Sequence, residues 1–404
     1  MGRVAVLFDR FGPYHVARLA TAARRLPLVG IEVFGESVEY AWDRVDSGAR
    51  FDRITLFPEA DAGSVAGAAV RLAVCDALER IRPAAVALPG WAHPAALAGL
   101  SWCVQRAVPA VVMSESNAWD EPRDPGREWL KRRVVSQCRA GLVGGDGHRE
   151  YLEALGLPRD TIFLGYDAVD NEHFAAGARA ARTDAQATRA ALGLPARYWL
   201  ASARFVAKKN LRRLLQAWAG YRRLVHAAAG GAEACDLVLV GDGELQAELL
   251  ACRRELGLDG SVHLPGFVQY AQLPAYYGLA EGFVHASTVE QWGLVVNEAM
   301  AAGLPVLVSR SCGCAANLVA DGENGTTFDP LDVDVLAGLL QQYCGLPAAA
   351  RAAMGQRSAA IVAGWGTERF AEGLASAVQA AGRSRAPQPS VLDRAVLWGL
   401  ERRG

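Results

Sequence analysis

Short runs rich in β-branched residues alternate with longer segments of helical periodicity along most of this chain, and this pattern leaves few folds open. Such alternation is typical of α/β proteins whose parallel sheet is covered by helices on both faces. In the first half, the apolar runs predict strands at residues 4–8, 29–34, 54–57, 84–88, 110–113, 142–144 and 162–165. Helical patterns are expected between most of them, notably at residues 14–26, 65–81, 94–106 and 150–155. The first half therefore predicts one doubly wound sheet.

A second alternation starts at residue 198, after a polar, alanine-rich stretch. It predicts strands at residues 200–203, 237–240, 262–264, 282–285 and 305–309, with helices at 210–225, 244–256, 273–279, 294–302 and 334–343. A chain of 404 residues also exceeds what one hydrophobic core usually supports. We therefore predict an α/β protein with two doubly wound, Rossmann-like domains facing a cleft, at residues 1–170 and 198–386. The stretch at residues 171–197 is expected to be the inter-domain connection.

Composition excludes several classes of partner. Net charge is −1, so no overall field would recruit nucleic acid or an anionic membrane, although local basic patches remain open. The N-terminus lacks the basic flank and long apolar run of a signal peptide, and no apolar run reaches the ~18 residues of a membrane span. The eight cysteines show no zinc-site spacing, and the only close pair is Cys312 and Cys314. We expect reduced thiols, no metal site and a cytoplasmic protein.

The most specific chemical signal lies in residues 284–309, VHASTVEQWGLVVNEAMAAGLPVLVS. Gly293 ends an irregular segment, and a helix is expected to begin at Leu294. The unpaired amides of Leu294 and Val295 at that helix N-terminus suit an anion. Glu290 precedes this anion site and Glu298 follows it, and carboxylates repel phosphate but accept hydrogen bonds from hydroxyl groups. Two carboxylates around one diphosphate site predict a nucleotide-sugar, with a sugar on one side and a ribose on the other.

The spacing of Glu290 and Glu298, followed by EAMAAGLPV, resembles the signature of retaining GT-B glycosyltransferases, most closely sequence family 4, the group 1 glycosyltransferases. Three further blocks occur in the family's order. Arg204 and Lys209 lie five apart after the first strand of the second domain, LVLVGDGELQAEL follows at residues 237–249, and VHLPGFVQY begins at residue 262. The resemblance covers residues 198–384.

This resemblance implies a role for each matching residue. Arg204 and Lys209 would bind the diphosphate and stabilise its developing charge, Glu290 would contact the transferred sugar, and Glu298 would contact the ribose. The remaining donor-binding candidates are Gly12, Gly241, Phe267, Val268, Gly293, Leu294 and Val295. Catalysis would be metal-independent, because the chain offers no DxD loop, and no cofactor is expected. In GT-B enzymes a C-terminal tail crosses back to the first domain, so residues 387–404, which follow a proline-rich break, are assigned there.

The first domain is expected to bind the acceptor. Gly12 is the only glycine left where many relatives carry two, and Tyr14 and His15 are acceptor candidates at the start of the next helix. His93 follows a strand end, and family members often use a histidine in this region to contact the sugar or the acceptor. The charged, aromatic segment 114–133 is read as a solvated loop, with an acceptor or membrane-surface loop as the alternative. Asp170 is read as part of the hinge.

Together these observations predict a hexosyl-transferring, retaining glycosyltransferase. It would move a sugar from a nucleoside-diphosphate sugar, with uridine diphosphate favoured by family frequency alone, to a hydroxyl of a glycan, lipid-linked or small-molecule acceptor. The alternatives are a nucleotide-sugar epimerase of GT-B fold and a non-catalytic GT-B scaffold. A two-carboxylate glycosidase has no use for Arg204 and Lys209, and a Rossmann oxidoreductase would need a G-x-G-x-x-G turn. Nucleic acid is not an expected partner, while peripheral membrane contact and the oligomeric state are left open.

Overall fold

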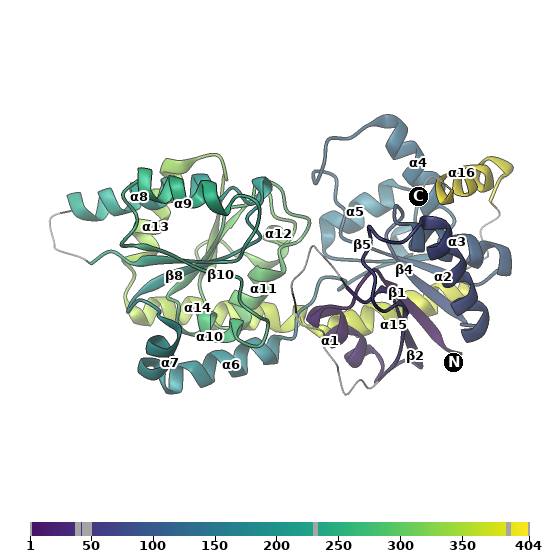
Figure 1. Cartoon of the computed structure of the whole chain (residues 1–404), viewed down its shortest axis with the longest axis horizontal. Helices are drawn as coiled ribbons and strands as arrows, with labels where there is room; N and C mark the ends of the chain where they lie inside the picture. The colour runs from purple at the N-terminus through teal and green to yellow at the C-terminus, as the bar shows by residue number, and fades with distance from the viewer. Residues whose placement is uncertain (1, 37–41, 43–50, 229–232, 385–388, 403–404) are drawn as a thin grey trace. The chain divides into compact units, whose positions relative to one another are not determined.

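In the computed structural model of the chain, the β-rich runs of the first half pair into one parallel sheet of order β3-β2-β1-β4-β5-β6-β7 (Figure 1). The structure describes residues 2–36, 42, 51–228, 233–384 and 389–402. The strands are β1 (Val4–Phe8), β2 (Leu28–Phe34), β3 (Asp52–Phe57), β4 (Ala85–Pro89), β5 (Ala110–Ser114), β6 (Ala140–Val143) and β7 (Ile162–Leu164). The predicted parallel α/β sheet of the first half is confirmed.

Helices cover both faces of this sheet, and β1 shows why. Its residues are all buried, with Val4, Val6 and Phe8 in one apolar cluster and Ala5 and Leu7 in another. Because side chains alternate along a strand, a fully apolar strand needs a cover on each face. The helices of this unit are α1 (Pro13–Ala22), α2 (Gly67–Ile81), α3 (Pro94–Arg106), α4 (Pro125–Val135), α5 (Asp146–Ala154), α15 (Thr367–Arg383) and α16 (Val391–Glu401), of which α16 packs on α3 and α4.

The second alternation forms a separate six-stranded parallel sheet of order β10-β9-β8-β11-β12-β13. Its strands are β8 (Tyr198–Ser202), β9 (Asp236–Val240), β10 (Val262–Gly266), β11 (Gly282–His285), β12 (Val306–Ser309) and β13 (Gly325–Phe328). Its helices are α6 (Asn171–Thr183), α7 (Ala185–Leu192), α8 (Leu211–Ala227), α9 (Gln246–Glu255), α10 (Leu273–Leu279), α11 (Leu294–Ala301), α12 (Ala315–Leu318), α13 (Val333–Cys344) and α14 (Ala348–Val362). The predicted pair of Rossmann-like sheets is therefore present.

The predicted inter-domain connection at residues 171–197 is wrong. Most of it forms α6 and α7, and the chain divides at Asp170, whose carboxylate caps α6 by accepting a hydrogen bond from the His173 amide at 3.2 Å. Helix α6 packs against α10 so closely that a Cβ on Gly278 would lie 2.7 Å from the Cα of Ala178. Arg182 adds a hydrogen bond to the Gly278 carbonyl at 2.8 Å. The second unit is therefore Asp170–Gly364.

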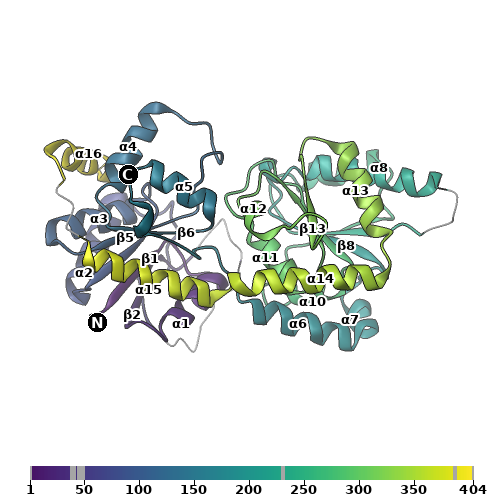
Figure 2. The ribbon, with the colours of Figure 1, turned by 180° about the vertical axis from the view of Figure 1, so that it is seen from behind.

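The chain returns to the first unit earlier than the predicted residue 387. The first unit comprises Met1–Val169 and Trp365–Gly404, because α15 packs along its sheet, as Figure 2 shows. A stripe of buried residues on α15 fills the space over that sheet: Phe370, Ala371, Leu374, Ala377, Val378 and Ala381. Gly373 permits the contact, since a Cβ there would lie 2.3 Å from the carbonyl oxygen of Leu164. Among the helices that the structure describes, none is long and apolar enough to span a bilayer.

Candidate functional site

The strand order of the second sheet reverses between β8 and β11. Chain connections run outward from β8 in one direction and from β11 in the other, so their following helices leave on opposite faces. In open parallel sheets, ligands bind outside the carboxyl ends of the strands at this reversal point. The loops that follow β8 and β11 are those that carry Lys209 and Glu290.

Hydrogen bonds tie the loops at this edge into one platform. The Phe205 amide donates to the Asp242 carbonyl at 2.7 Å, and the Thr288 amide donates to the Lys208 carbonyl at 2.9 Å. Buried Asn210 joins three loops, since its side-chain amide donates to the carbonyls of Ala286 and Pro330 at 3.0 and 2.7 Å. The backbone of Lys208 and Lys209 is therefore held from both sides.

Gly241 is required for this arrangement. Its φ is 139°, and a Cβ there would lie 1.8 Å from the Ala203 carbonyl oxygen. Its amide donates to the Gly266 carbonyl at 3.0 Å, which links the ends of β9 and β10. Any side chain at this position would push apart the loop that carries Arg204. Gly241, predicted as a donor-binding residue, has a clear structural role at the same edge.

Lys209 and Glu290 meet across the reversal point. The Lys209 ammonium forms an ion pair with Glu290 Oε2, although the two residues lie 81 positions apart, and each side chain is only 12% exposed. His285 Nε2 lies 3.2 Å from the same carboxylate oxygen, and the Ser287 hydroxyl donates to it at 3.2 Å. Figure 1 labels β8, the strand that precedes Lys209, and α11, the helix that follows Glu290. The site therefore holds a buried charge pair with additional polar support, which a buried pair requires.

The charge state of this cluster is well defined. Burial alone would raise the pKa of Glu290, but the hydrogen bond from His285 and the charge of Lys209 outweigh it and hold that pKa well below its usual range. Burial lowers the pKa of His285 despite its bond to Glu290. An ionised carboxylate only accepts hydrogen bonds, so neutral His285 carries its proton on Nε2. The Glu290 carboxylate is therefore ionised and lies beside a neutral imidazole.

The start of α11 lies directly after this pair. Gly293 has φ of 105°, which favours glycine, and lets the chain turn into the helix. The Trp292 indole donates to the Asn297 side chain at 2.9 Å, while the Gly313 and Cys314 amides donate to the carbonyls of Glu290 and Trp292. Leu294 and Val295 are half-buried, whereas the following residues of the helix are buried. The first-turn amides of α11 thus lie at the accessible end of a fixed helix, as expected for an anion site.

Glu298 lies elsewhere. Its side chain is completely buried and accepts a hydrogen bond from the Tyr277 hydroxyl at 2.7 Å. Burial and the adjacent Glu298 charge raise the pKa of Tyr277 well above its ordinary value, so this phenol remains a donor. The structure therefore separates the two carboxylates: Glu290 joins Lys209, while Glu298 faces the interior. Ribose contact by Glu298 would require this carboxylate to leave its buried position.

The other predicted donor residues of the second unit lie in loops at the same edge, whereas Gly12 lies in the first unit. Arg204 is half-buried in the loop after β8. Phe267 and Val268 follow β10, where Phe267 is 38% exposed and Val268 is buried. An exposed aromatic ring can stack on a base, whereas Val268 can offer only its backbone. Lys208 is exposed, so Lys209 alone of the two lysines turns toward Glu290.

The first unit has its own reversal point, between β1 and β4. There His93 Nδ1 lies 3.2 Å from Asp9 Oδ2, which pairs the loop after β4 with the loop after β1. Burial raises the pKa of Asp9, and the neighbouring His93 partly offsets this. His93 is also the N-cap residue of α3, ahead of Pro94, but its side chain makes no capping bond. The structure thus brings the predicted His93 to a reversal point, beside a carboxylate that the sequence analysis did not select.

The acceptor candidates at the start of α1 differ in setting. His15 Nδ1 accepts a hydrogen bond from the Gly12 amide at 3.2 Å, and its ring packs 4.4 Å from that of Phe8. Burial and the charge of Arg18 lower the pKa of His15 to about 3. Tyr14 packs edge-on against Trp42. His15 therefore caps the N-terminus of its own helix by accepting a hydrogen bond from the Gly12 amide.

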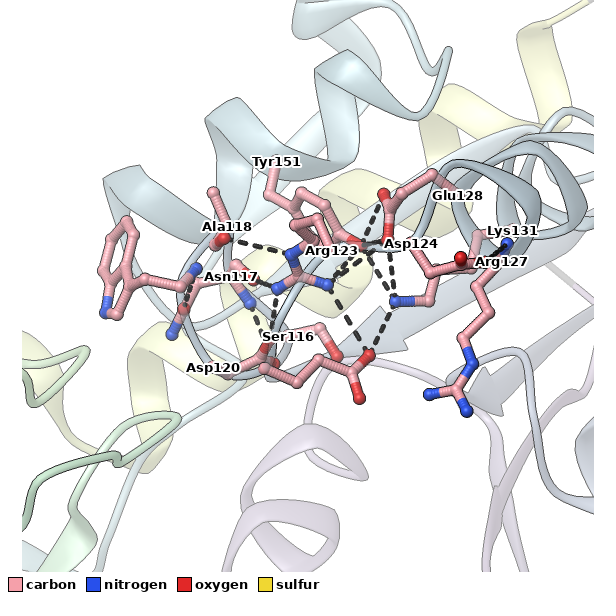
Figure 3. A network of polar contacts seen from close by, with 12 residues as sticks. Ser116, Asn117, Ala118, Asp120, Arg123, Asp124, Arg127, Glu128, Lys131 and Tyr151 are labelled. Atoms are coloured by element: carbon pink, nitrogen blue, oxygen red, sulfur yellow. Dashed lines mark hydrogen bonds and ion pairs between the residues drawn. The ribbon is translucent and has the colours of Figure 1, made fainter.

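The segment at residues 114–133 is not simply a solvated loop, because from Pro125 onward it belongs to α4. Figure 3 shows Arg123 at the centre of a polar network that fixes the preceding loop. Arg123 contacts the Asn117 carbonyl and Asp120, and its Nη1 donates to the Tyr151 hydroxyl at 2.9 Å. Lys131 extends the network through ion pairs with Glu121 and Glu128, at 2.9 and 3.0 Å. The loop after β5 is thus held rigidly against α4 and α5.

Sequence reasoning missed Asp9, His285, Ser287, Asn210 and Tyr277. For His285 and Ser287 a signal existed, since both lie at the carboxyl end of an apolar strand, where polar residues are exceptional. The buried positions of Asn210 and Tyr277 depend on loops distant in sequence and carry no local signal. Within the described part of the chain, no group of three or more His, Cys, Asp or Glu side chains is arranged to hold a metal. Burial raises the pKa of Cys312 well above its ordinary value, so this thiol stays protonated.

Two parallel-sheet Rossmann-like units define the GT-B class of glycosyltransferase folds. Residues 184–360, all within the second unit, match the family described as "Glycosyl transferases group 1". The second unit therefore carries a group 1 glycosyltransferase domain, and the family prediction made from its motifs is confirmed.

Curated relatives support this family over part of their length. The chain is 32% identical over 159 residues to the GDP-mannose-dependent alpha-(1-6)-phosphatidylinositol monomannoside mannosyltransferase of Mycolicibacterium smegmatis, an alignment that covers 38% of this chain and 39% of that protein. It is 27% identical over 231 residues to the alpha-D-kanosaminyltransferase of Streptomyces kanamyceticus, covering 55% of this chain and 56% of that protein. The alignments thus span about two-fifths to just over half of these relatives.

Solved structures match almost the whole fold at low identity. The sucrose-phosphate synthase of Thermosynechococcus elongatus has a TM-score of 0.70 at 18% identity, covering 93% of this chain and 98% of that one. Anabaena HepE in complex with UDP has a TM-score of 0.69 at 17% identity, with the same coverage. At this identity the likeness establishes the fold alone.

Proposed function

We propose that the protein is a retaining glycosyltransferase that moves a sugar from a nucleoside-diphosphate sugar to a hydroxyl group. The observation that carries the proposal is the buried Lys209–Glu290 pair at the reversal point of the second sheet, directly before the first turn of α11. One cation, one carboxylate and a helix N-terminus are the groups that a diphosphate joined to a sugar requires. A scaffold without chemistry would have no use for a charge pair kept in so buried a setting.

In the structure, Lys209 and Glu290 form an ion pair in which the two charges neutralise each other. A donor diphosphate entering at the α11 amides would take over the Lys209 ammonium and leave Glu290 to its bonds with His285 and Ser287. The freed carboxylate would then accept hydrogen bonds from the sugar hydroxyls and stabilise positive charge that develops on the sugar. Lys209, with Arg204 nearby in sequence, would stabilise the departing diphosphate. The acceptor would attack from the same face, which retains the anomeric configuration.

Uridine diphosphate is the donor nucleotide that we propose, and the transferred group is a hexose. The Anabaena structure named above was solved with UDP, while the mycobacterial relative is named for GDP-mannose. The exposed ring of Phe267 offers an aromatic face that any base could use. Catalysis is proposed to need no metal, since Lys209 supplies the positive charge. The acceptor is proposed to be a glycan, a lipid-linked sugar or a small-molecule hydroxyl.

A thermal-shift screen with UDP, GDP, ADP and dTDP tests this proposal most directly. A nucleotide at 100 times its dissociation constant should add about 2.7 kcal/mol to the free energy of unfolding. The screen should be run with EDTA and repeated on Lys209→Ala, with Lys208→Ala as the matched control. Stabilisation by one nucleotide in EDTA, lost only in Lys209→Ala, supports the site. No shift with any of the four nucleotides would contradict it.

Product analysis then separates the proposed reaction from its rivals. With the stabilising nucleotide's sugar as donor, a transferase yields a glycoside whose anomeric configuration is read by NMR. Retention is expected. Formation of an epimerised sugar without an acceptor product would identify the GT-B epimerase alternative instead.

A further inference from the structure

The outer side of α16 is an exposed apolar and basic surface. This helix buries Leu397 and Asp393 against the first unit and exposes its opposite side. Val391 is 87%, Leu392 48% and Trp398 56% exposed, and the Arg402 guanidinium lies 4.2 Å from the Trp398 ring. Large apolar side chains grouped on one helix side are uncommon on a monomer surface and mark an interaction site.

Helix α4 extends this surface. Arg133 donates to Asp393 Oδ1 at 3.1 Å, and this bond joins α4 to α16, which lie side by side in Figures 1 and 2. Trp129 on α4 is 41% exposed, with the Arg133 guanidinium 5.2 Å from its ring. Arg127 and Arg132 are exposed as well, and Figure 3 shows Arg127 pointing away from the polar network. We call the surface formed by Arg127, Trp129, Arg132, Leu392, Arg394 and Trp398 the α4–α16 face.

The acidic side chains of these helices are engaged at other contacts. Glu128 accepts from Lys131 and Tyr151 inside the polar network, and Asp393 accepts from Arg133 and from the Ser390 hydroxyl. Glu401 pairs with Arg71 at 3.8 Å. The exposed charges on the outer side of α16 are therefore those of Arg394 and Arg402. A positive surface on a chain of net charge −1 is a local feature, distinct from the overall balance.

We propose that the α4–α16 face docks onto an anionic lipid surface, with α16 lying in the plane of the interface. Exposed aliphatic residues and tryptophans bury into the headgroup region, while arginines at the rim bind lipid phosphates. A second copy of the chain fits less well, because a two-fold interface would place these arginines opposite each other. Nucleic acid would leave Val391 and Leu392 without a partner. Charge complementarity therefore selects an anionic membrane.

Vesicle sedimentation with the full chain tests the proposal without any sugar donor, so its outcome is independent of the proposed transferase activity. We expect binding to vesicles of phosphatidylcholine mixed with phosphatidylglycerol and little binding to phosphatidylcholine alone. The double variant Arg132→Glu with Arg394→Glu should weaken binding at least about 25-fold, since each basic residue near such a surface contributes roughly fivefold. Trp398→Ala should weaken it about tenfold through lost apolar burial.

Matched variants in the second unit control for general effects of charge and apolarity. Arg223→Glu and Leu331→Ala alter an exposed arginine and a 61% exposed leucine and should leave vesicle binding unchanged. Circular dichroism should confirm that every variant is folded. Equal binding to both vesicle types, or unchanged binding by the double arginine variant, would overturn the proposal. So would a dimer in sedimentation velocity that Trp398→Ala dissociates in a chain that binds no vesicles, because the face would then serve a second copy.

Discussion

At the carboxyl edge of each sheet, a lysine or histidine side chain contacts a carboxylate, but one pair is buried and the other is exposed. In the second unit, Lys209 and Glu290 are each 12% exposed, and His285 and Ser287 hold the carboxylate in place. In the first unit, the corresponding pair of loops brings His93 to Asp9, with the two side chains 61% and 36% exposed. Both pairs join the first strand of a sheet to the strand across its reversal point. Only the second is a fixed, buried charge pair.

This difference indicates a division of labour. Charges fixed in a water-poor site stabilise a transition state without reorganisation, whereas exposed side chains on loops adapt to the shape of a bound molecule. The family match at residues 184–360 also lies wholly in the unit that holds the buried pair. On the proposed function, the second edge would serve a constant chemical step, and the first would bind a variable partner.

Removing the cation of the buried pair should have the largest effect. Lys209→Ala leaves Glu290 buried without its counter-ion and removes the charge that, in the proposed mechanism, would face the leaving diphosphate. We expect kcat/KM for transfer to fall by roughly 100- to 1000-fold, or about 3 kcal/mol. Lys208→Ala is the matched control, because this exposed neighbour should change the rate by less than about threefold. Near-native turnover by Lys209→Ala would contradict the proposal that the buried pair, and not the exposed one, serves the chemical step.

Neutralising the carboxylate should have a somewhat smaller effect, of a different kind. Glu290→Gln keeps the size of the side chain but loses the charge that we propose contacts the sugar, so kcat should fall on the order of 100-fold. Binding of the free nucleoside diphosphate, measured by titration calorimetry, should hold or strengthen, because Lys209 is no longer neutralised. If Glu290→Gln weakened that binding more than Glu298→Gln does, the assigned orientation of the donor would be reversed.

The sequence predicted the two sheets well because their strands are unusually clear. Residues 4–8 were predicted with the bounds that β1 has, since five successive apolar residues between polar ones indicate a doubly covered strand. The prediction from sequence failed at residues 171–192, where alanine-rich, polar composition suggested a linker. Small residues are there because α6 packs closely on α10, as the Gly278 contact shows. Likewise, nothing local to α15 indicates that its alanine stripe fits the first sheet.

The candidate site was predictable only where a family motif covers it. Local pattern places Glu290 before a helix, but its partner is 81 residues away, and only the resemblance brought Lys209 into the same site. The burial of Glu298 behind Tyr277 was not foreseeable, because the donor hydroxyl comes from α10. The pairing of Asp9 with His93 depends on the strand order of a sheet whose register a single sequence does not reveal.

Acid should weaken the first unit through His15. Its folded pKa of about 3 lies below the value near 6.5 of an unfolded histidine, so the unfolded chain binds a proton first as the pH falls. Stability from neutral His15 is thus complete above pH ~6.5 and is lost progressively toward pH ~3. Between pH 7 and pH 5 the loss should reach about 2 kcal/mol, measured by urea unfolding. A chain whose stability is unaffected by this change in pH would contradict the lowered pKa of His15.

A matched variant tests whether His15 causes this loss of stability in acid. Glutamine at the third position of a helix can also accept a hydrogen bond from the N-cap amide, so His15→Gln keeps the bond to Gly12 but does not titrate. Its stability should therefore fall less between pH 7 and pH 5 than that of the native chain. His226→Gln, at an exposed position on α8, should leave the pH dependence as it is. Equal pH dependence in all three chains would assign the acid sensitivity to other groups.

The smallest effects are expected at the exposed pair, and their order distinguishes a contacting residue from a positioning residue. If His93 hydrogen-bonds the acceptor or the sugar, His93→Asn should raise the acceptor KM or lower kcat/KM about tenfold, the value of one net hydrogen bond. If Asp9 acts by orienting the His93 ring through the 3.2 Å contact, Asp9→Asn should cost about threefold or less. In the double variant the Asp9 change should add little, because its effect passes through His93.

Donor binding should be unchanged in all three variants, since the buried pair of the second unit is intact. An Asp9→Asn variant slower than His93→Asn would show that the carboxylate itself contacts substrate, and the exposed edge would then hold a chemical group of its own.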